Sequence, residues 1–285
     1  MPHVLRFLKN KRCKTSPWND EVPIRQELFG IERLEQHAES LALAQQTTAT
    51  PPSVSSLHKR LNNNAEVLLK TYYIIAAELE DGHSVAHSAE WLLDNYHIVE
   101  TQIREIRDDL PPGYYRQLPK LADGPFVGYP RVLGLAWAFV AHTDSHFDPD
   151  NLRRFIQAYQ RIQALTIGEL WAVAITLRIV LIENLRRLAE QIEAGRSSRA
   201  EAEEFAKTLL QTDRSRLDLE KDLASRASQP VSDTFIAHLS KRLRIKIHAL
   251  CRPWPGWRSW PENRKYPSMT WCSEPSNRKV HPMSA

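Results

Sequence analysis

Glycine is scarce in this chain, with 9 residues among 285. No segment matches GxxxxGK[ST] or GxGxxG, the Gly-rich loops that hold nucleotide phosphates on backbone N–H groups. No segment shows the sustained apolar–polar alternation of half-buried strands. These absences argue against a phosphate-loop enzyme, a dinucleotide-binding enzyme and a β-rich fold.

Cysteine and long apolar runs are also sparse. The longest apolar run covers residues 170–182, is interrupted by Thr176 and Arg178, and falls short of the ~20 residues of a membrane span. No N-terminal signal peptide is visible. The cysteines form no CxxC pair and lie near the ends of the chain: Cys13, Cys251 and Cys272. We therefore expect a cytoplasmic protein in a reducing compartment, with no transmembrane segment in this chain.

The net charge of +4 lies entirely in the last part of the chain. Residues 251–285 hold six basic and two acidic side chains, which leaves residues 1–250 formally neutral. Nucleic-acid binding needs a concentrated basic face, so no nucleic-acid partner is expected. The basic cluster within residues 1–20 is interpreted as a flexible N-terminus.

Residues 21–250 carry apolar stripes at helical spacing. We expect a helix from about Pro23 to Gln46, a linker at Thr47–Ser53, and two helices with alternating four- and three-residue steps. Those two helices cover about residues 56–79 and 84–110, with Ser84 able to cap the second, and should pack as an antiparallel hairpin.

The second half of this region should be helical as well. Thr166 and Glu169 form a capping-box pattern that opens the longest and most apolar helix, which we expect to end at Gly195. Trp171 on this helix is predicted to be deeply buried, in the same environment as Ala174, Leu177 and Leu181. The remaining helices are expected at about residues 131–141, 151–163, 199–211, 213–226 and 232–250.

Together these patterns predict an all-α fold, an irregular antiparallel helical bundle of about seven to nine helices with long central hairpin helices. It should occupy residues 21–250 as one helical domain. Residues 251–285 hold four of the eight Trp and six of the eighteen Pro, but no Leu, Ile or Phe. We expect them to form a disordered Trp/Pro-rich C-terminal tail.

Three acidic or histidine patterns suggest metal sites but have simpler explanations. Asp148-Pro-Asp150 matches the DxD of metal-dependent glycosyltransferases, yet it precedes a helix, where Asp148 or Asp150 is favoured as an N-cap. His83 and His87 have helical i, i+4 spacing without a third ligand nearby. His142, Asp144 and His146 are interpreted as ordinary loop polarity. We therefore expect no catalytic residue, no metal and no cofactor.

A binding or interface site is the one site hypothesis that the sequence offers. The segment 111–130 is rich in Pro, Gly and aromatic residues, and loops of this length are often functional or packed down on the fold. Its aromatic faces can stack on sugar rings and its cations can reach hydroxyl groups, although packing onto the bundle is the alternative. The candidate residues are Tyr114, Tyr115, Arg116, Lys120 and Arg131.

Long strings of this sequence resemble the N-terminal cytoplasmic region of the bacterial cyclic β-1,2-glucan synthases. They are Pro23–Ala42 (PIRQELFGIERLEQHAESLA), Ala89–Leu121 (AEWLLDNYHIVETQIREIRDDLPPGYYRQLPKL) and Leu165–Ala189 (LTIGELWAVAITLRIVLIENLRRLA). The resemblance implies a non-catalytic helical scaffold at the cytoplasmic face of the inner membrane. Its partners in intact relatives are the membrane and transferase domains of the same chain, which use UDP-glucose.

The resemblance leaves several points open. The abrupt change of composition near residue 250 is the kind that a frameshift or truncation produces, with a genuine divergent tail as the alternative. Lacking a transferase signature such as QxxRW, the chain is expected to be inactive alone. Two other functions are a free-standing helical binding or regulatory module, and a small enzyme with a site at the 111–131 loop.

Overall fold

The computed structural model describes residues 18, 21–82, 85–210, 225–226 and 231–250, with the backbone alone for residues 244–250. Four expectations fall wholly or largely outside this part: the flexible N-terminus, the cap at Ser84, the helix at 213–226 and the disordered tail. The helix that Ser84 was expected to cap begins later, at His87 after the N-cap Ala86.

The described part is almost entirely helical, which confirms the all-α prediction. One short antiparallel pair joins Thr47 to Leu121 and Thr48 to Lys120. The elements are α1 (Ile31–Ala44), β1 (Thr47–Thr48), α2 (Leu57–Glu80), α3 (His87–Asp109), α4 (Pro112–Gln117), β2 (Lys120–Leu121), α5 (Arg131–His142), α6 (Pro149–Ile162), α7 (Ile167–Leu209) and α9 (Asp233–Leu250).

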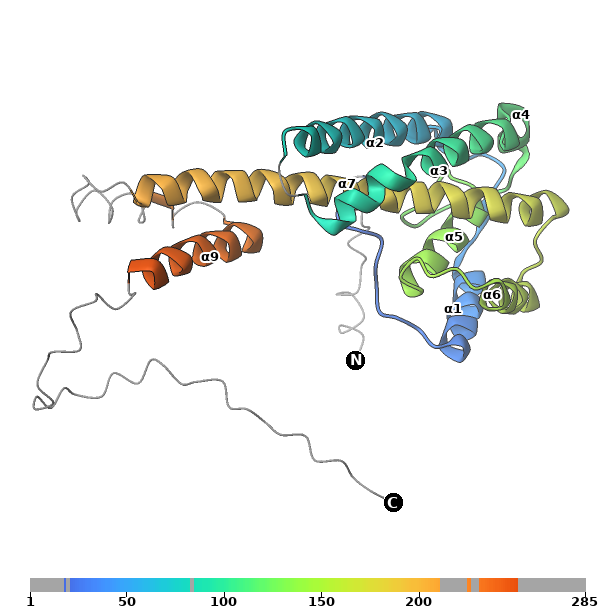
Figure 1. The fold of residues 1–285 in the computed structure, drawn as a ribbon. Helices are drawn as coiled ribbons and strands as arrows, with labels where there is room; N and C mark the ends of the chain where they lie inside the picture. Colours follow the sequence, from blue (N-terminus) through green and yellow to red (C-terminus); the bar gives the residue numbers. More distant parts are fainter. Residues whose placement is uncertain (1–17, 19–20, 83–84, 211–224, 227–230, 251–285) are drawn as a thin grey trace, which may run out of the picture.

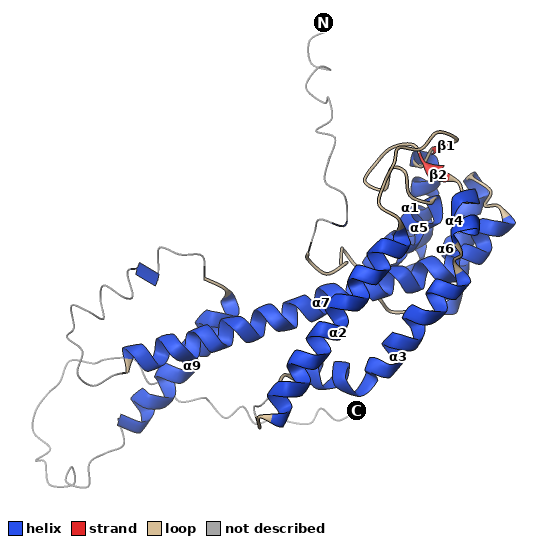
Figure 2. Ribbon diagram, turned by 90° about the horizontal axis from the view of Figure 1, so that it is seen from above, coloured by secondary structure: helices blue, strands red, loops and turns tan. Residues whose placement is uncertain are grey.

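Helix α7 is the axis of the molecule. Helices α2, α3 and α5 pack on its first part, while α1 and α6 pack on each other beyond α5 (Figure 1). Its second part extends past this bundle and is accompanied by α9 (Figure 2). A single helix therefore connects the bundle to the α9 region.

Helices α2 and α3 form the predicted antiparallel hairpin. Ser56 begins α2 with its side chain accepting a hydrogen bond from the N–H of Lys59. The alternating steps place one stripe of each helix inside, and that stripe is buried: Leu61, Leu68 and Ile75 on α2, and Leu92, Val99, Ile103 and Ile106 on α3. Both helices also contact α7, so the hairpin buries its apolar stripes against the axis.

The prediction of a helix from Pro23 is wrong, because α1 begins only at Ile31. The preceding segment is extended and is held by tertiary hydrogen bonds. The N–H groups of Gln26 and Phe29 donate to the carbonyls of Ala141 (2.9 Å) and His142 (3.1 Å) at the end of α5. These bonds satisfy backbone groups that a helix would otherwise have paired.

The segment 111–130 has more structure than expected. Pro112 occupies the first turn of α4, where its missing N–H costs no hydrogen bond. Strand β2 follows and pairs with β1, so the Thr47–Ser53 linker also contains a strand. Gly124 and Gly128 have φ of +79° and +81°, which favours glycine there. The segment is thus a packed connection.

Gly195 does not end the long helix, as had been predicted. Helix α7 continues through it to Leu209, and includes the residues expected to form a separate helix from Arg199. Glycine in a helix interior costs only about 1 kcal/mol relative to alanine. Arg196 bridges Glu193 on α7 and Glu78 on α2 next to this position, at 2.6 and 2.9 Å. These ion pairs favour the helical conformation across the glycine.

The buried carboxylate of Glu183 ties α7 to its surroundings. Its side chain is 0% exposed and accepts from Arg60 (2.7 and 2.8 Å), Asn64 (2.9 Å) and Arg187 (2.9 Å). Arg186 adds a contact of 3.3 Å. Through Arg60 and Asn64, this carboxylate joins α7 to α2.

The surroundings of Glu183 also determine its ionisation. Burial would raise the pKa of this carboxyl group, but the hydrogen bonds and charge of Arg60, with Arg187 and Asn64, outweigh burial and lower the pKa to about 2. The carboxyl group of Glu183 is therefore ionised in the folded protein at neutral pH.

Trp171 is not part of the core, contrary to the prediction. Its side chain is 73% exposed, and Ala174 on the same face is exposed too, whereas Leu177 is buried. The start of α7 is apolar all round, but α2, α3 and α5 do not enclose every face of it. Apolar content alone therefore identified the central helix without identifying its buried side.

Replacing Glu183 should destabilise the fold strongly. Glu183→Gln leaves Arg60 and Arg187 without their buried counter-charge, which typically costs ~3–5 kcal/mol. In the native chain the stabilisation by Glu183 is present above its unfolded pKa near 4.5 and is lost as the pH falls towards 2. Urea unfolding at pH 7 and pH 3 measures both effects.

Glu66→Gln is the matched control, because Glu66 lies exposed on α2. We expect it to change the free energy of unfolding by less than about 0.5 kcal/mol. Equal effects of the two substitutions would contradict the assignment of Glu183 as the central ionic contact.

Trp171→Ala should leave the stability nearly unchanged, because the side chain is mostly solvated. We expect a loss below about 1 kcal/mol, against ~2–5 kcal/mol for Leu177→Ala, which removes a buried side chain from the same helix. Thermal unfolding of the two variants compares them directly. A loss of several kcal/mol from Trp171→Ala would mean that this face is covered in solution.

Candidate functional site

Three of the five predicted site residues point into the fold. Arg131 makes a bidentate ion pair with Glu169, at 2.7 and 2.8 Å, and its side chain is buried. Lys120 donates to the carbonyl of Tyr115 and lies 4.0 Å from the centre of its ring. Burial lowers the pKa of Lys120 to about 8, and burial, with Tyr129 adding, raises that of Tyr115 to about 12.

The other two predicted residues, Tyr114 and Arg116, lie towards the surface on α4. The hydroxyl of Tyr114 donates to the carbonyl of Gly168 in the first turn of α7. Arg116 is exposed, and its Nε donates to the carbonyl of Pro112. The five residues therefore do not converge on one cavity, and the sugar-binding surface remains a prediction. Through its hydrogen bond to Gly168, Tyr114 contacts the start of α7.

An exposed apolar face begins at that point. It consists of Ile167, Leu170, Trp171 and Ala174, which have the i, i+3, i+4, i+7 spacing of one helix face. Ile167 is 70% exposed and Leu170 is 39% exposed. We call this set the Trp171 face. An exposed cluster of large apolar side chains that includes Trp is typical of a protein interface.

The position of the Trp171 face is well fixed. The side chain of Thr166 accepts from the N–H of Glu169 (3.2 Å), while Glu169 accepts from the N–H of Thr166 (2.9 Å), which confirms the predicted capping box. Because Glu169 is also paired with Arg131, the first turn of α7 is joined to α5. This face was not predicted from the sequence, because Trp171 was expected in the core. The sequence signal for this face is an apolar stripe that directly follows the capping box at the start of α7.

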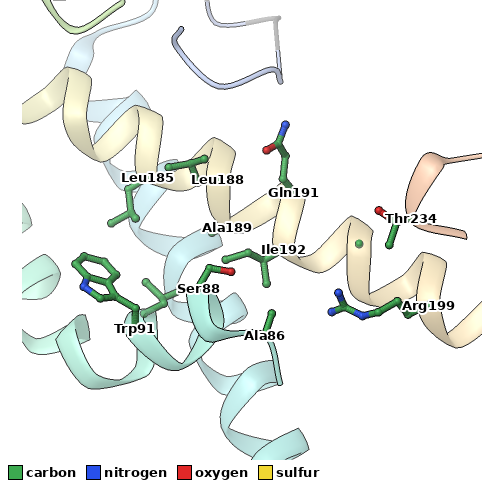
Figure 3. A pocket seen from close by; sticks show the side chains of 12 residues that line it. Ala86, Ser88, Trp91, Leu185, Leu188, Ala189, Gln191, Ile192, Arg199 and Thr234 are labelled. Carbon is green, nitrogen blue, oxygen red and sulfur yellow. The ribbon is translucent and has the colours of Figure 1, made fainter. Parts of the chain in front are cut away.

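An apolar groove lies farther along α7, where it meets the start of α3 (Figure 3). It has a volume of about 560 Å³. Trp91, Leu185, Leu188 and Ile192 line its apolar part, and Arg199 and Thr234 lie at the end near α9 (Figure 3). Its lining is suited to an apolar chain or side chains, because few polar groups reach it.

The acidic motif at Asp148 and Asp150 serves the helix, as expected. The carboxylate of Asp148 accepts from the N–H groups of Asp150 (2.8 Å) and Asn151 (3.4 Å) at the start of α6. Asp150 pairs instead with Arg153 at 3.1 Å. The two carboxylates thus have separate structural partners, and capping explains the motif.

The histidines also have separate partners. His87 is highly exposed and lies 3.4 Å from Glu90, while His83 is outside the described residues. His142 donates from Nδ1 to the carbonyl of Glu27 at 2.7 Å, and Asp144 accepts from Arg25. Within the described ranges, no group of three or more His, Cys, Asp or Glu side chains is arranged to hold a metal ion.

Among the described residues, two buried acids are chemical candidates, and each forms ion pairs with arginine. Glu169 pairs with Arg131, and Glu183 pairs with Arg60 and Arg187. A general acid or base needs a pKa near the working pH, whereas the pKa of Glu183 is held at about 2. The arrangement is suited to fixing helices together.

In the described ranges, no helix combines the length and the apolar character needed to cross a bilayer.

Comparison with known proteins gives one informative match. No family model matches the chain. The cyclic β-(1,2)-glucan synthase NdvB of Rhizobium meliloti (strain 1021) is 38% identical over 243 residues, which is 83% of this chain and 8% of that protein. The chain therefore spans less than a tenth of the length of the relative it matches. Over most of its own length, this helical chain is related to the cyclic β-1,2-glucan synthases.

Proposed function

We propose that this chain is a non-catalytic helical scaffold that docks, through the Trp171 face, on the rest of a cyclic β-1,2-glucan synthase. In this proposal it acts in the cytoplasm, at the face of the inner membrane, and the transferase part of the synthase uses UDP-glucose. The single observation that carries the docking step is the exposed Trp171 on an otherwise well-anchored helix.

The relative supports the choice of partner. More than nine-tenths of NdvB lies outside the stretch that this chain matches, so a large protein surface is available to cover an exposed apolar face. An exposed cluster of Ile, Leu and Trp is costly in water, and its burial by a partner is favourable by about 25 cal/mol for each Å² of apolar surface removed from water. Trp is also among the residues that most often dominate binding energy at interfaces.

The non-catalytic part of the proposal follows from the charged groups of the described ranges. The buried carboxylates are paired with arginine, and Asp148 caps a helix. Groups with such fixed partners stabilise helix contacts and are poorly placed to transfer protons or to hold a nucleotide sugar.

One experiment tests both parts. Membranes containing NdvB from which the matched segment has been deleted are incubated with the purified chain and labelled UDP-glucose, and co-sedimentation and glucan are measured. We expect the chain to sediment with these membranes and to make no glucan when incubated alone. Trp171→Ala should reduce co-sedimentation about tenfold or more, as expected for an interface Trp worth ~2 kcal/mol.

Trp91→Ala is the matched control, since Trp91 is also exposed (51%) but lies in the groove near α3. It should sediment like the unchanged chain. Equal binding of all three proteins would refute docking through the Trp171 face. Reproducible glucan synthesis by the chain alone would refute the non-catalytic role.

A further inference from the structure

A small pocket lies between α1, α5 and the turn at residues 121–126, and has a volume of about 310 Å³. This is at the lower end of the ~300–1,000 Å³ of small-molecule sites. It shares no residue with the Trp171 face or with the groove of Figure 3. The side chains considered below are Gln45, His37, His142, Asp123, Phe126 and Trp137, all of which line it.

The side-chain amide of Gln45 is held at its oxygen, whereas its nitrogen has no acceptor among the described residues. Its Oε1 accepts from the hydroxyl of Tyr159 at 3.0 Å. Its Nε2 lies 2.8 Å from the point where a Cβ on Gly134 would stand, and no described residue accepts a hydrogen bond from it. The Nε2 group is thus available to donate a hydrogen bond to a ligand next to Gly134. Any larger residue at position 134 would displace the amide.

Two imidazoles add further polar groups to the lining. His142 is buried, and its Nδ1 donates to the carbonyl of Glu27, which leaves Nε2 as the ring nitrogen without a hydrogen-bond partner among the described residues. His37 lies with its ring centre 4.6 Å from that of His142 and makes no hydrogen bond to a described residue. Burial, followed by the nearby His142, lowers the pKa of His37, so its ring is neutral at pH 7.

The remaining lining narrows the class of ligand. The lining contains no Lys or Arg, and Asp123 adds a carboxylate at the exposed turn, so phosphate groups are disfavoured. A purely apolar ligand would leave Nε2 of Gln45, Nε2 of His142 and the ring nitrogens of His37 without hydrogen-bond partners. Phe126 and Trp137, with ring centres 5.2 Å apart, offer aromatic surface for a ring-shaped ligand.

We propose that this pocket is a binding site for one neutral, hydroxyl-rich ring, that is, a single hexose unit. Gln45 donates to a hydroxyl oxygen, the imidazoles accept from hydroxyl hydrogens, and the aromatic side chains contact the apolar face of the ring. The proposal does not rest on the proposed function, because it uses none of the residues of the docking face.

The test is NMR titration of the full chain with three ring compounds, following the side-chain amide of Gln45 and the imidazole of His37. Glucose should shift both signals saturably. Glucose 6-phosphate, which adds charge, and cyclohexanol, which lacks most hydroxyls, should bind at least about tenfold more weakly.

Paired glycine variants locate the site. Gly134→Ala pushes the Gln45 amide aside and should weaken glucose binding about tenfold. Gly195→Ala makes the same change on α7, where nothing lies within 4 Å of the new Cβ, and should bind glucose like the unchanged chain. Gln45→Leu should repeat the loss without altering the backbone.

Three results would overturn the proposal. The first is no saturable shift with glucose. The second is equal glucose affinity in the Gly134→Ala, Gln45→Leu and Gly195→Ala variants, each confirmed as folded by thermal unfolding. The third is binding of glucose 6-phosphate or cyclohexanol as tight as that of glucose.

Discussion

The buried carboxylate of Glu183 is the contact on which the arrangement of this molecule depends. It is shared by Arg60 of α2 and by Arg187 of its own helix, and Arg187 also donates to the carbonyl of Val22 at 2.7 Å. Next to it, Asn184 accepts from the N–H of Ile24 at 2.7 Å. One turn of α7 thereby fixes both the helical hairpin and the extended N-terminal segment. Removal of either partner from such a cluster leaves a buried charge uncompensated.

The positions of the buried carboxylates Glu169 and Glu183 on α7 explain why Trp171 is exposed. Glu169 and Glu183 are separated by nearly four full helical turns, so both lie on similar sides of α7, one towards α5 and the other towards α2. Trp171 follows Glu169 by two residues, about 200° around the helix, and therefore faces away from the Arg131 pair. The ion pairs hold one side of α7 against α2 and α5. The opposite apolar side at the start of α7 is left exposed to solvent. This geometry links the internal ion pairs to the proposed docking face.

The sequence was most informative where a local hydrogen bond determines the structure. The cap at Thr166 was predicted correctly, and the cap of α6 was predicted as Asp148 or Asp150, because each needs only residues within one turn. Features that depend on contacts between distant parts of the chain could not be predicted in this way. The pattern at Trp171 shows an apolar helix but not which side the neighbours cover, and the ion pairs across Gly195 depend on a distant helix. Arg131 was identified as a site residue, although its buried partner Glu169 was recognised only as a cap.

Native-state hydrogen exchange along α7 tests the central role of Glu183 most directly. If the ion cluster holds the helix, the amides of residues 176–187 should exchange slowest in the chain, with protection close to the free energy of global unfolding. Residues 200–209, which extend beyond the hairpin with α9 beside them, should exchange faster by local opening. Equal protection of the two stretches, or faster exchange around Glu183, would contradict the account.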